Sequence, residues 1–244
     1  MIKAYAKSDI GKVREINQDS FYISDSLDEV QIYMLADGMG GYKGGEIASS
    51  LAIQSAKNYI QNNFKEIEKD KDSIIQLVGS AVEYANMVIY EKSKESKDLQ
   101  GMGTTLEICL IYNNRVYIGH VGDSRIYRIR KDFMRKLTQD HSYVQKLVKD
   151  GTITQEEAKN HPQKNLLMRA LGCNAFVEPD VMVKGFLKDD ILIISSDGLT
   201  NLVSNEEIFK HAKKDIEQAP KELVKMANEN GGYDNITVIV IKNI

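Results

Sequence analysis

The chain has 244 residues, of which 42% are hydrophobic, and its 32 basic and 35 acidic side chains give a formal charge of −3. This near balance gives no reason to expect nucleic acid or an acidic membrane as a partner. No run of about 18 apolar residues could span a bilayer, and the start MIKAYAKSDIGKVRE lacks the apolar segment of a signal peptide. We therefore expect a cytoplasmic protein. Because no segment has the composition of a linker, we expect a single domain over residues 1–244.

Apolar periodicity predicts nine strands and two long helices. The strands cover 2–8, 20–24, 30–36, 105–112, 115–121, 125–130, 181–186, 190–195 and 236–242, and the helical patterns run over 47–60 and 74–89. Both helices lie between the third and fourth strands. Helices that are grouped in this way favour layered α+β packing over a doubly wound parallel sheet.

Turn and cap residues predict how some of these elements are joined. Asn113 and Asn114 predict a tight hairpin turn, and we expect the strands on either side of GDS (122–124) to pair as another hairpin. Thr154 with Glu157, and Ser204 with Glu207, match the capping box that opens a helix, and Pro220 suits the first turn of a last helix.

Two other residue types call for a structural interpretation. Cys109 and Cys173 are 64 positions apart, and we expect buried or half-buried thiols rather than a disulfide. His120 lies in an apolar run, where a hydrogen-bonded core histidine is the expected role.

Four aspartates stand where an apolar strand meets a turn. They are Asp37 (MLADGMGG), Asp123 (HVGDSR), Asp197 (IISSDGL) and Asp234 (GGYDNITV). Two carboxylates about 4 Å apart repel by about 4 kcal/mol at an effective dielectric near 20, so convergence of all four requires cations to offset the repulsion. We interpret the set as a cage for hard divalent metal ions.

Nine short motifs in one order cover nearly the whole chain. They are VREINQDS (13–20), ADGMGGYKGGE (36–46), GMGTTL (101–106), HVGDSRIY (120–127), LTQDHS (137–142), NHPQKN (160–165), RALG (169–172), SSDGL (195–199) and GGYDNITV (231–238). Any one of them is common, but the series resembles the metal-dependent protein phosphatases of the 2C type. It is most similar to the compact bacterial members, which dephosphorylate serine and threonine on proteins.

The resemblance implies a four-layer α-β-β-α sandwich, in which two mostly antiparallel sheets are flanked by helix pairs, with a flap segment at about 143–165. It also implies a centre of two Mn²⁺ or Mg²⁺ ions at one end of the sandwich. Asp37 would bridge both ions, the backbone carbonyl of Gly38 would bind one of them, and Asp197 and Asp234 would hold the other. The implied reaction is direct attack of a metal-bridging water on phosphorus, without a phosphoenzyme. Oxygen-only ligands suit these ions.

Further roles follow from the same resemblance. Arg14 would bind phosphate, for which a planar guanidinium is suited because it can donate paired hydrogen bonds. Asp123 would help Asp197 to hold a third, weaker metal ion near the flap, and Asp19 would orient metal-bound water. Two positions depart from the family pattern: Gln18 replaces a glutamate of the outer metal shell, and Met39 replaces a histidine that many eukaryotic members have after the DG pair. A thioether cannot act as a general acid.

Each of these residues also has a structural interpretation. A single aspartate at a turn usually bonds its own backbone, and a lone arginine usually forms a surface ion pair. For Asp123 the two interpretations are evenly balanced, whereas the joint occurrence of Asp37, Asp197 and Asp234 favours metal binding.

We expect phosphorylated proteins and a cognate serine/threonine kinase as partners, and a monomer. Two alternative functions remain open: a phosphatase dedicated to one regulatory protein, and a catalytically silent module that binds phosphoproteins.

Overall fold

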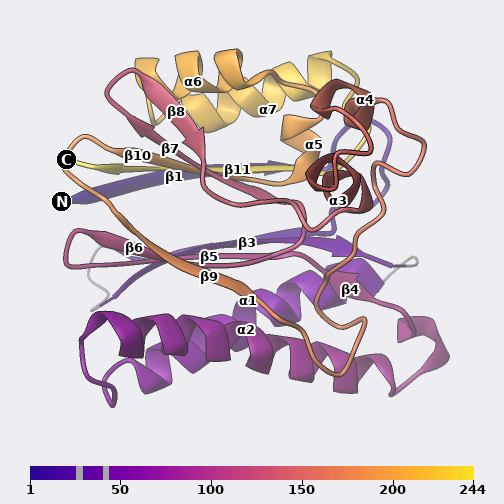
Figure 1. Cartoon of the computed structure of the whole chain (residues 1–244), viewed down its shortest axis with the longest axis horizontal. Coiled ribbons are helices and arrows are strands. Elements are labelled where there is room, and N and C mark those ends of the chain that lie inside the picture. The colour runs from indigo at the N-terminus through magenta and orange to yellow at the C-terminus, as the bar shows by residue number, and fades with distance from the viewer. Residues whose placement is uncertain (26–29, 41–43) are drawn as a thin grey trace.

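Two β-sheets lie face to face, and a pair of helices covers the outer face of each sheet (Figure 1). This arrangement is seen in a computed structural model that describes residues 1–25, 30–40 and 44–244. The strand pairs are antiparallel throughout these residues. The expected four-layer α+β sandwich is therefore confirmed.

The first sheet carries both terminal strands and most of the strands in the second half of the chain. Its strand order is β1 (Ile2–Asp9), β11 (Ile236–Asn243), β10 (Ile191–Ser195), β7 (Arg125–Arg130) and β8 (Phe133–Lys136). Its outer face is covered by α6 (Asn205–Lys214) and α7 (Ala219–Glu229), and the short α5 (Asp197–Thr200) follows β10 (Figure 1).

The second sheet is covered by the two long helices. Its order is β2 (Asp19–Ile23), β3 (Gln31–Met39), β5 (Leu106–Tyr112), β6 (Arg115–Val121) and β9 (Asp180–Gly185), and β4 (Gly103–Thr104) pairs with the end of β3. Its outer face is covered by α1 (Gly44–Asn63) and α2 (Lys71–Ser93), and the 3₁₀ turn η1 (Lys97–Leu99) follows α2. Between β8 and β9, α3 (Tyr143–Lys149) and α4 (Gln155–Lys159) occupy the segment expected to form the flap.

Alternation along the strands divides the apolar side chains into three layers. In β3, Ile32 and Met34 pack against α1 and α2, whereas Tyr33 and Leu35 belong to the core between the sheets. A corresponding layer joins the first sheet to α6 and α7. Because successive side chains of a strand point to opposite faces, each sheet buries both of its faces.

The hairpin expected across residues 122–124 is wrong. β6 belongs to the second sheet and β7 to the first, so the chain crosses from one sheet to the other at this point. Gly122 has a φ of +120°, which favours glycine, and an added Cβ would overlap Thr105. Two apolar strands joined by a short turn give the same local pattern whether they pair with each other or lie in facing sheets. The pattern also missed the short strands β4 and β8.

Most of the other local expectations are confirmed. Asn113 and Asn114 have φ values of 47° and 57° in the β5–β6 turn, and Thr154 forms a capping box at the start of α4. The Ser204 side chain caps α6, and Pro220 lies in the first turn of α7. Both cysteines are free, but Cys173 is exposed rather than half-buried.

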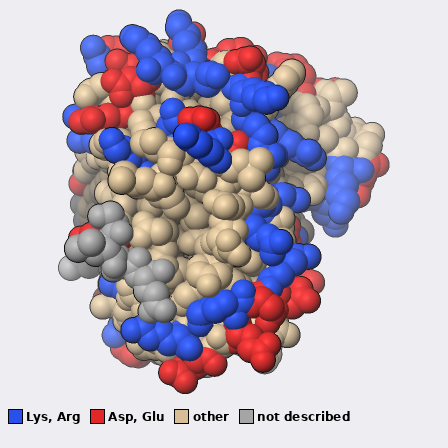
Figure 2. Space-filling view, turned by 90° about the vertical axis from the view of Figure 1, so that its left-hand side faces the viewer, with Lys and Arg blue, Asp and Glu red and all other residues tan. Residues whose placement is uncertain are grey.

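The two ends of the sandwich differ. Both termini lie at one end (Figure 1), where Figure 2 shows a broad area without charged side chains, with both basic and acidic side chains around it. The opposite end carries α3, α4 and α5 (Figure 1). Among the described residues, no helix combines the length and the apolar character needed to cross a bilayer.

Candidate metal centre

Asp19 and Asp37 form a cross-strand pair at the end of the second sheet. They are directly opposite each other on β2 and β3, so their Cβ atoms are expected to lie about 5 Å apart. Asp37 has the same parity in β3 as Tyr33 and Leu35, which face the other sheet. The pair therefore faces the space between the two sheets.

Asp197 and Asp234 approach this pair from the first sheet. Asp197 begins α5 just after β10, and Asp234 lies two positions before the start of β11. Gly198 allows the two segments to come together, because an added Cβ would overlap the Asn235 carbonyl oxygen and would stand 3.4 Å from Cβ of Asp234. The smallest residue is thus needed between the two carboxylates.

Asp123 lies where the chain crosses between the sheets. Gly122, which precedes it, is held by His141: the Gly122 carbonyl accepts from the His141 N–H at 2.7 Å, and the Gly122 N–H donates to His141 Nδ1 at 3.1 Å. Asp123 does not lie in the hairpin that the turn interpretation assumed, because β6 and β7 belong to different sheets. Its carboxylate is close enough to Asp197 and Asp140 for both to raise its pKa.

The pKa values show that these carboxyl groups share one poorly solvated region. Burial is the main cause in each case, and it raises the pKa of Asp19 to about 7 and that of Asp123 to about 8. Burial also raises the pKa of Asp37 well above its usual range, with further contributions from the charges of Asp19, Asp197, Asp123 and Asp234. The pKa of Asp197 is raised by burial and by Asp234, although a hydrogen bond with the Asp37 side chain opposes this shift. Nearby positive charge would relieve the repulsion.

Asp19 is the most enclosed member of the group, with 9% of its surface exposed. Its Oδ2 accepts from Ser196 Oγ at 2.9 Å and from Thr237 Oγ1 at 2.7 Å. Its Oδ1 is buried and has no hydrogen-bond partner. A buried carboxylate oxygen without a partner is costly unless a water molecule or a cation meets it.

Arg14 lies at the rim beside Asp234. Its Nη2 is 2.9 Å from Asp234 Oδ2, across 220 positions of sequence. The two segments are also joined by the Lys12 N–H, which donates to the Gly232 carbonyl at 2.7 Å. About half of the Arg14 side chain (51%) is exposed, so its remaining N–H groups can reach an incoming anion.

Gly38 and Gln18 lie at the junction of β3, β2 and α1. The Gly38 N–H donates to the Gln18 carbonyl at 3.1 Å, and an added Cβ at Gly38 would overlap the Gly45 carbonyl oxygen. The Gln18 side chain packs against Gly45, and its Nε2 donates to the Gly40 carbonyl at 3.4 Å. Gly41, Tyr42 and Lys43 of the same motif lie outside the described residues.

Several residues that support the centre were not found from the sequence. Thr105 Oγ1 accepts from the Asp37 N–H at 2.9 Å, and Thr104 Oγ1 donates to the Asp37 carbonyl at 2.9 Å. Asn235 Oδ1 accepts from the Gln18 N–H, and its Nδ2 donates to the carbonyls of Ile10 and Ile16. The available signals were the TT of GMGTTL, two polar residues just before an apolar strand, and the N of YDN, which follows Asp234.

The donor chemistry fits hard divalent cations. The carboxylate oxygens converge from both sheets, and their charges repel one another. Among residues 1–25, 30–40 and 44–244, however, no three Asp, Glu, His or Cys side chains stand ready to hold a single ion together. Hard cations in proteins also take backbone carbonyls and water as ligands. The orphaned Oδ1 of Asp19 and the raised pKa values both fit a site that is completed by cations.

Comparison with known proteins supports the same interpretation. A profile described as protein phosphatase 2C matches residues 12–232. The serine/threonine phosphatase stp of Listeria innocua is 38% identical over 244 residues, which span 97% of this chain and 94% of that protein. The S. agalactiae serine/threonine phosphatase structure has a TM-score of 0.91 at 36% identity and covers 100% of both chains.

A third relative carries metal ions. The structure of the catalytic domain of serine threonine protein phosphatase PstP, in complex with 2 manganese ions, has a TM-score of 0.86 at 34% identity and covers 99% of this chain and 97% of that one. By sequence and by fold, the chain belongs to the protein phosphatase 2C family of metal-dependent serine/threonine phosphatases.

Proposed function

We propose that this chain removes phosphate from phosphoserine and phosphothreonine on proteins, with residues 1–244 acting as one catalytic domain. The observation that carries the proposal is the convergence of acidic side chains from both sheets at one end of the sandwich, beside an exposed arginine. The family match supports the reaction class.

Two Mn²⁺ or Mg²⁺ ions would be held at this centre. Asp37 is the proposed ligand of both ions, the backbone carbonyl of Gly38 would bind one of them, and Asp197 and Asp234 would hold the other. When bound, such ions lower the pKa of water and offset the charge of a phosphoryl group. The two-manganese PstP structure supports this number of ions. Asp19 is proposed to orient metal-bound water, because Ser196 and Thr237 fix one of its oxygens and leave the other without a partner. Gln18 is proposed to lie in the outer shell of the same centre.

Arg14 is proposed to bind the phosphoryl group. Its bond to Asp234 uses Nη2. The other N–H groups of the guanidinium can donate hydrogen bonds to two phosphate oxygens. The same bond fixes the guanidinium beside the centre, so the phosphoryl group is oriented toward the ions.

Asp123 is proposed to hold a third, weaker ion together with Asp197. The support is that the charge of Asp197 raises the pKa of Asp123, and that Asp123 lies at the sheet crossing. A flap at about 143–165, a cytoplasmic location, a monomeric state and a cognate serine/threonine kinase remain parts of this proposal.

Phosphate release from a phosphothreonine peptide tests the function. We expect release with Mn²⁺ and none with excess chelator. Folded protein that binds the peptide but releases no phosphate with Mn²⁺ would contradict the proposal and point to a silent binding module, which the family comparison does not favour.

A further inference from the structure

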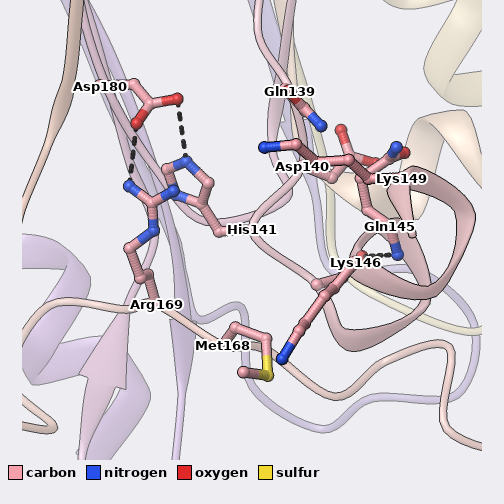
Figure 3. Close-up of a pocket in the computed structure, with 10 residues that line it drawn as sticks. Gln139, Asp140, His141, Gln145, Lys146, Lys149, Met168, Arg169 and Asp180 are labelled. Carbon is pink, nitrogen blue, oxygen red and sulfur yellow. Dashed lines mark hydrogen bonds and ion pairs between the residues drawn. The ribbon is translucent and has the colours of Figure 1, made fainter.

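A cavity of about 360 Å³ opens beside the metal centre, outside the residues assigned to it. It lies between α3, the segment 139–142, the segment 168–169 and the start of β9 (Figure 3). His141 forms part of its wall and also contacts Gly122, the residue before Asp123. The cavity therefore adjoins the Asp123 side of the centre, whereas Arg14 lies on the Asp234 side.

The acidic side chains that line this cavity are already paired. Asp180 bonds Arg169 at 2.8 Å and lies 3.2 Å from His141 Nε2. Asp140 accepts from Arg125 at 2.7 Å and from Lys136 at 3.0 Å. The side chains of Arg169, Arg125 and Lys136 thus neutralise these two carboxylates, so the wall has no unpaired negative charge.

Two lysines of the wall have no such partner. Lys146 and Lys149 are three positions apart in α3, so they project from the same face of the helix. Within the part of the chain that the structure describes, neither lysine forms an ion pair, and Figure 3 shows bonds at Asp180 but none at the ends of these lysines. The cavity consequently carries an excess of positive charge.

An apolar edge completes the opening. Met168 lines the cavity with 51% of its surface exposed, and Leu166 nearby is 48% exposed. Leu166 also accepts a hydrogen bond through its carbonyl from the Tyr143 N–H at 2.8 Å, so this edge is tied to the start of α3. An extended peptide bound across the metal centre would contact these two apolar side chains at the edge of the cavity, and the two lysines beyond them.

We propose that this cavity is a second anion site, which receives an acidic or phosphorylated side chain of the protein substrate at a distance from the phosphoryl group being removed. The inference rests on the proposed function and deepens it by naming a substrate class: segments in which the phosphorylated residue has a negative neighbour. Carboxylate and phosphoryl groups share the chemistry that the two lysines recognise, and a second phosphate carries the larger charge.

The test compares phosphothreonine peptides that are otherwise neutral with peptides carrying one glutamate, or one non-hydrolysable phosphonate analogue of phosphoserine, within six residues on either side. Six extended residues reach about 20 Å. At low ionic strength we expect KM to fall about tenfold at one or two positions, equivalent to about 1.4 kcal/mol, with more effect from the phosphonate than from glutamate. Salt should reduce the difference.

Lys146→Ala/Lys149→Ala should abolish this preference while the turnover of para-nitrophenyl phosphate stays unchanged. Alanine is the best helix former, so α3 is retained. The matched control is Lys184→Ala/Lys188→Ala, which removes the same charge from two exposed lysines of β9 and the turn after it. The control should keep the preference.

Two results would overturn the second anion site: equal KM for neutral and acidic peptides at every position in the unmodified protein, or an equal loss of preference in the control. If the unmodified protein fails to hydrolyse para-nitrophenyl phosphate with Mn²⁺, the proposed function itself fails. Hydrolysis of that compound without any peptide preference rejects the second site alone.

Discussion

Asp19 lies directly opposite Asp37 on neighbouring strands, and one oxygen of Asp19 is buried without a partner. Like charges in this relationship destabilise a sheet. The folded protein without metal avoids part of this cost by retaining protons that the unfolded chain would release. The two aspartates thus link metal binding, protonation and stability.

The stability of the metal-free protein should decrease as pH rises from about 4 to about 7. The pKa of Asp19 is about 7 in the folded protein against an ordinary value of 3.8. In this window the folded state binds more protons than the unfolded state, so the free energy of unfolding falls with pH. Urea denaturation at pH 5, 6, 7 and 8 with chelator measures the slope.

Mn²⁺ should reduce this pH dependence, and Asp19→Asn should make it shallower without metal. The pKa of Glu107 is also raised to about 7, so Glu107 contributes to the slope as well. The difference in slope between the unmodified protein and Asp19→Asn measures the contribution that depends on Asp19. A slope that is the same in Asp19→Asn would assign the effect to other groups.

Asp197→Ala should abolish Mn²⁺-dependent turnover and the rise in Tm that Mn²⁺ produces. A ligand stabilises a protein only in proportion to its binding to the folded state. Without metal the variant should be at least as stable as the unmodified protein, because one repelling carboxylate is gone. Scanning calorimetry with and without Mn²⁺ measures the stability without metal and the rise in Tm, and phosphate release measures turnover. Asp98→Ala, at an exposed position, is the control. Retained turnover in Asp197→Ala would reject the metal assignment.

Gly198→Ala should reduce activity and destabilise the fold by about 2 kcal/mol or more. Its Cβ would overlap the Asn235 carbonyl oxygen, so α5 and the start of β11 must move apart. That movement separates Asp197 from Asp234. Chemical denaturation and Mn²⁺ titration calorimetry measure the two effects. Gly151→Ala is a useful comparison, because no atom lies within 4 Å of the added Cβ, although its φ of +73° adds backbone strain. Equal Mn²⁺ affinity in both variants would argue against the role of Gly198.

Arg14→Ala should lower kcat/KM for phosphopeptides about 100-fold, since two charge-assisted hydrogen bonds contribute about 3 kcal/mol. Arg14→Lys should recover only part of this loss, because an ammonium group lacks the paired donor geometry. Stability should change little, as the Arg14–Asp234 pair is largely exposed. Steady-state kinetics with both variants measures the effect. Full activity in Arg14→Lys would show that charge alone is required.

The sequence predicted the main strands well because both faces of each sheet are buried and the apolar runs are long. It failed between β6 and β7, where two apolar strands joined by a short turn were predicted to form a hairpin but lie in different sheets. The motifs predicted the site aspartates, and the structure brings these carboxyl groups close together. Ser196, Thr237 and Asn235 were missed because polar residues near turns usually bond their own backbone, and their partners lie far away in the chain.

His120→Ala should damage stability more than chemistry. His120 and Glu107 are fully buried, and His120 Nδ1 lies 2.6 Å from Glu107 Oε1. Nε2 of His120 lies 2.8 Å from the Gln139 carbonyl, while Glu107 Oε2 has no partner. Removing the imidazole leaves a buried carboxyl group unpaired, which costs about 3 to 5 kcal/mol.

A double variant separates this effect from a loss of packing. Glu107→Met/His120→Leu removes both polar groups and should be more stable than His120→Ala, because a buried pair can be replaced by apolar side chains at little cost. Below its Tm, His120→Ala should keep kcat within a few-fold of the unmodified protein. A loss of kcat as large as that of Asp197→Ala, in protein that remains folded, would place His120 in the chemistry instead of the core.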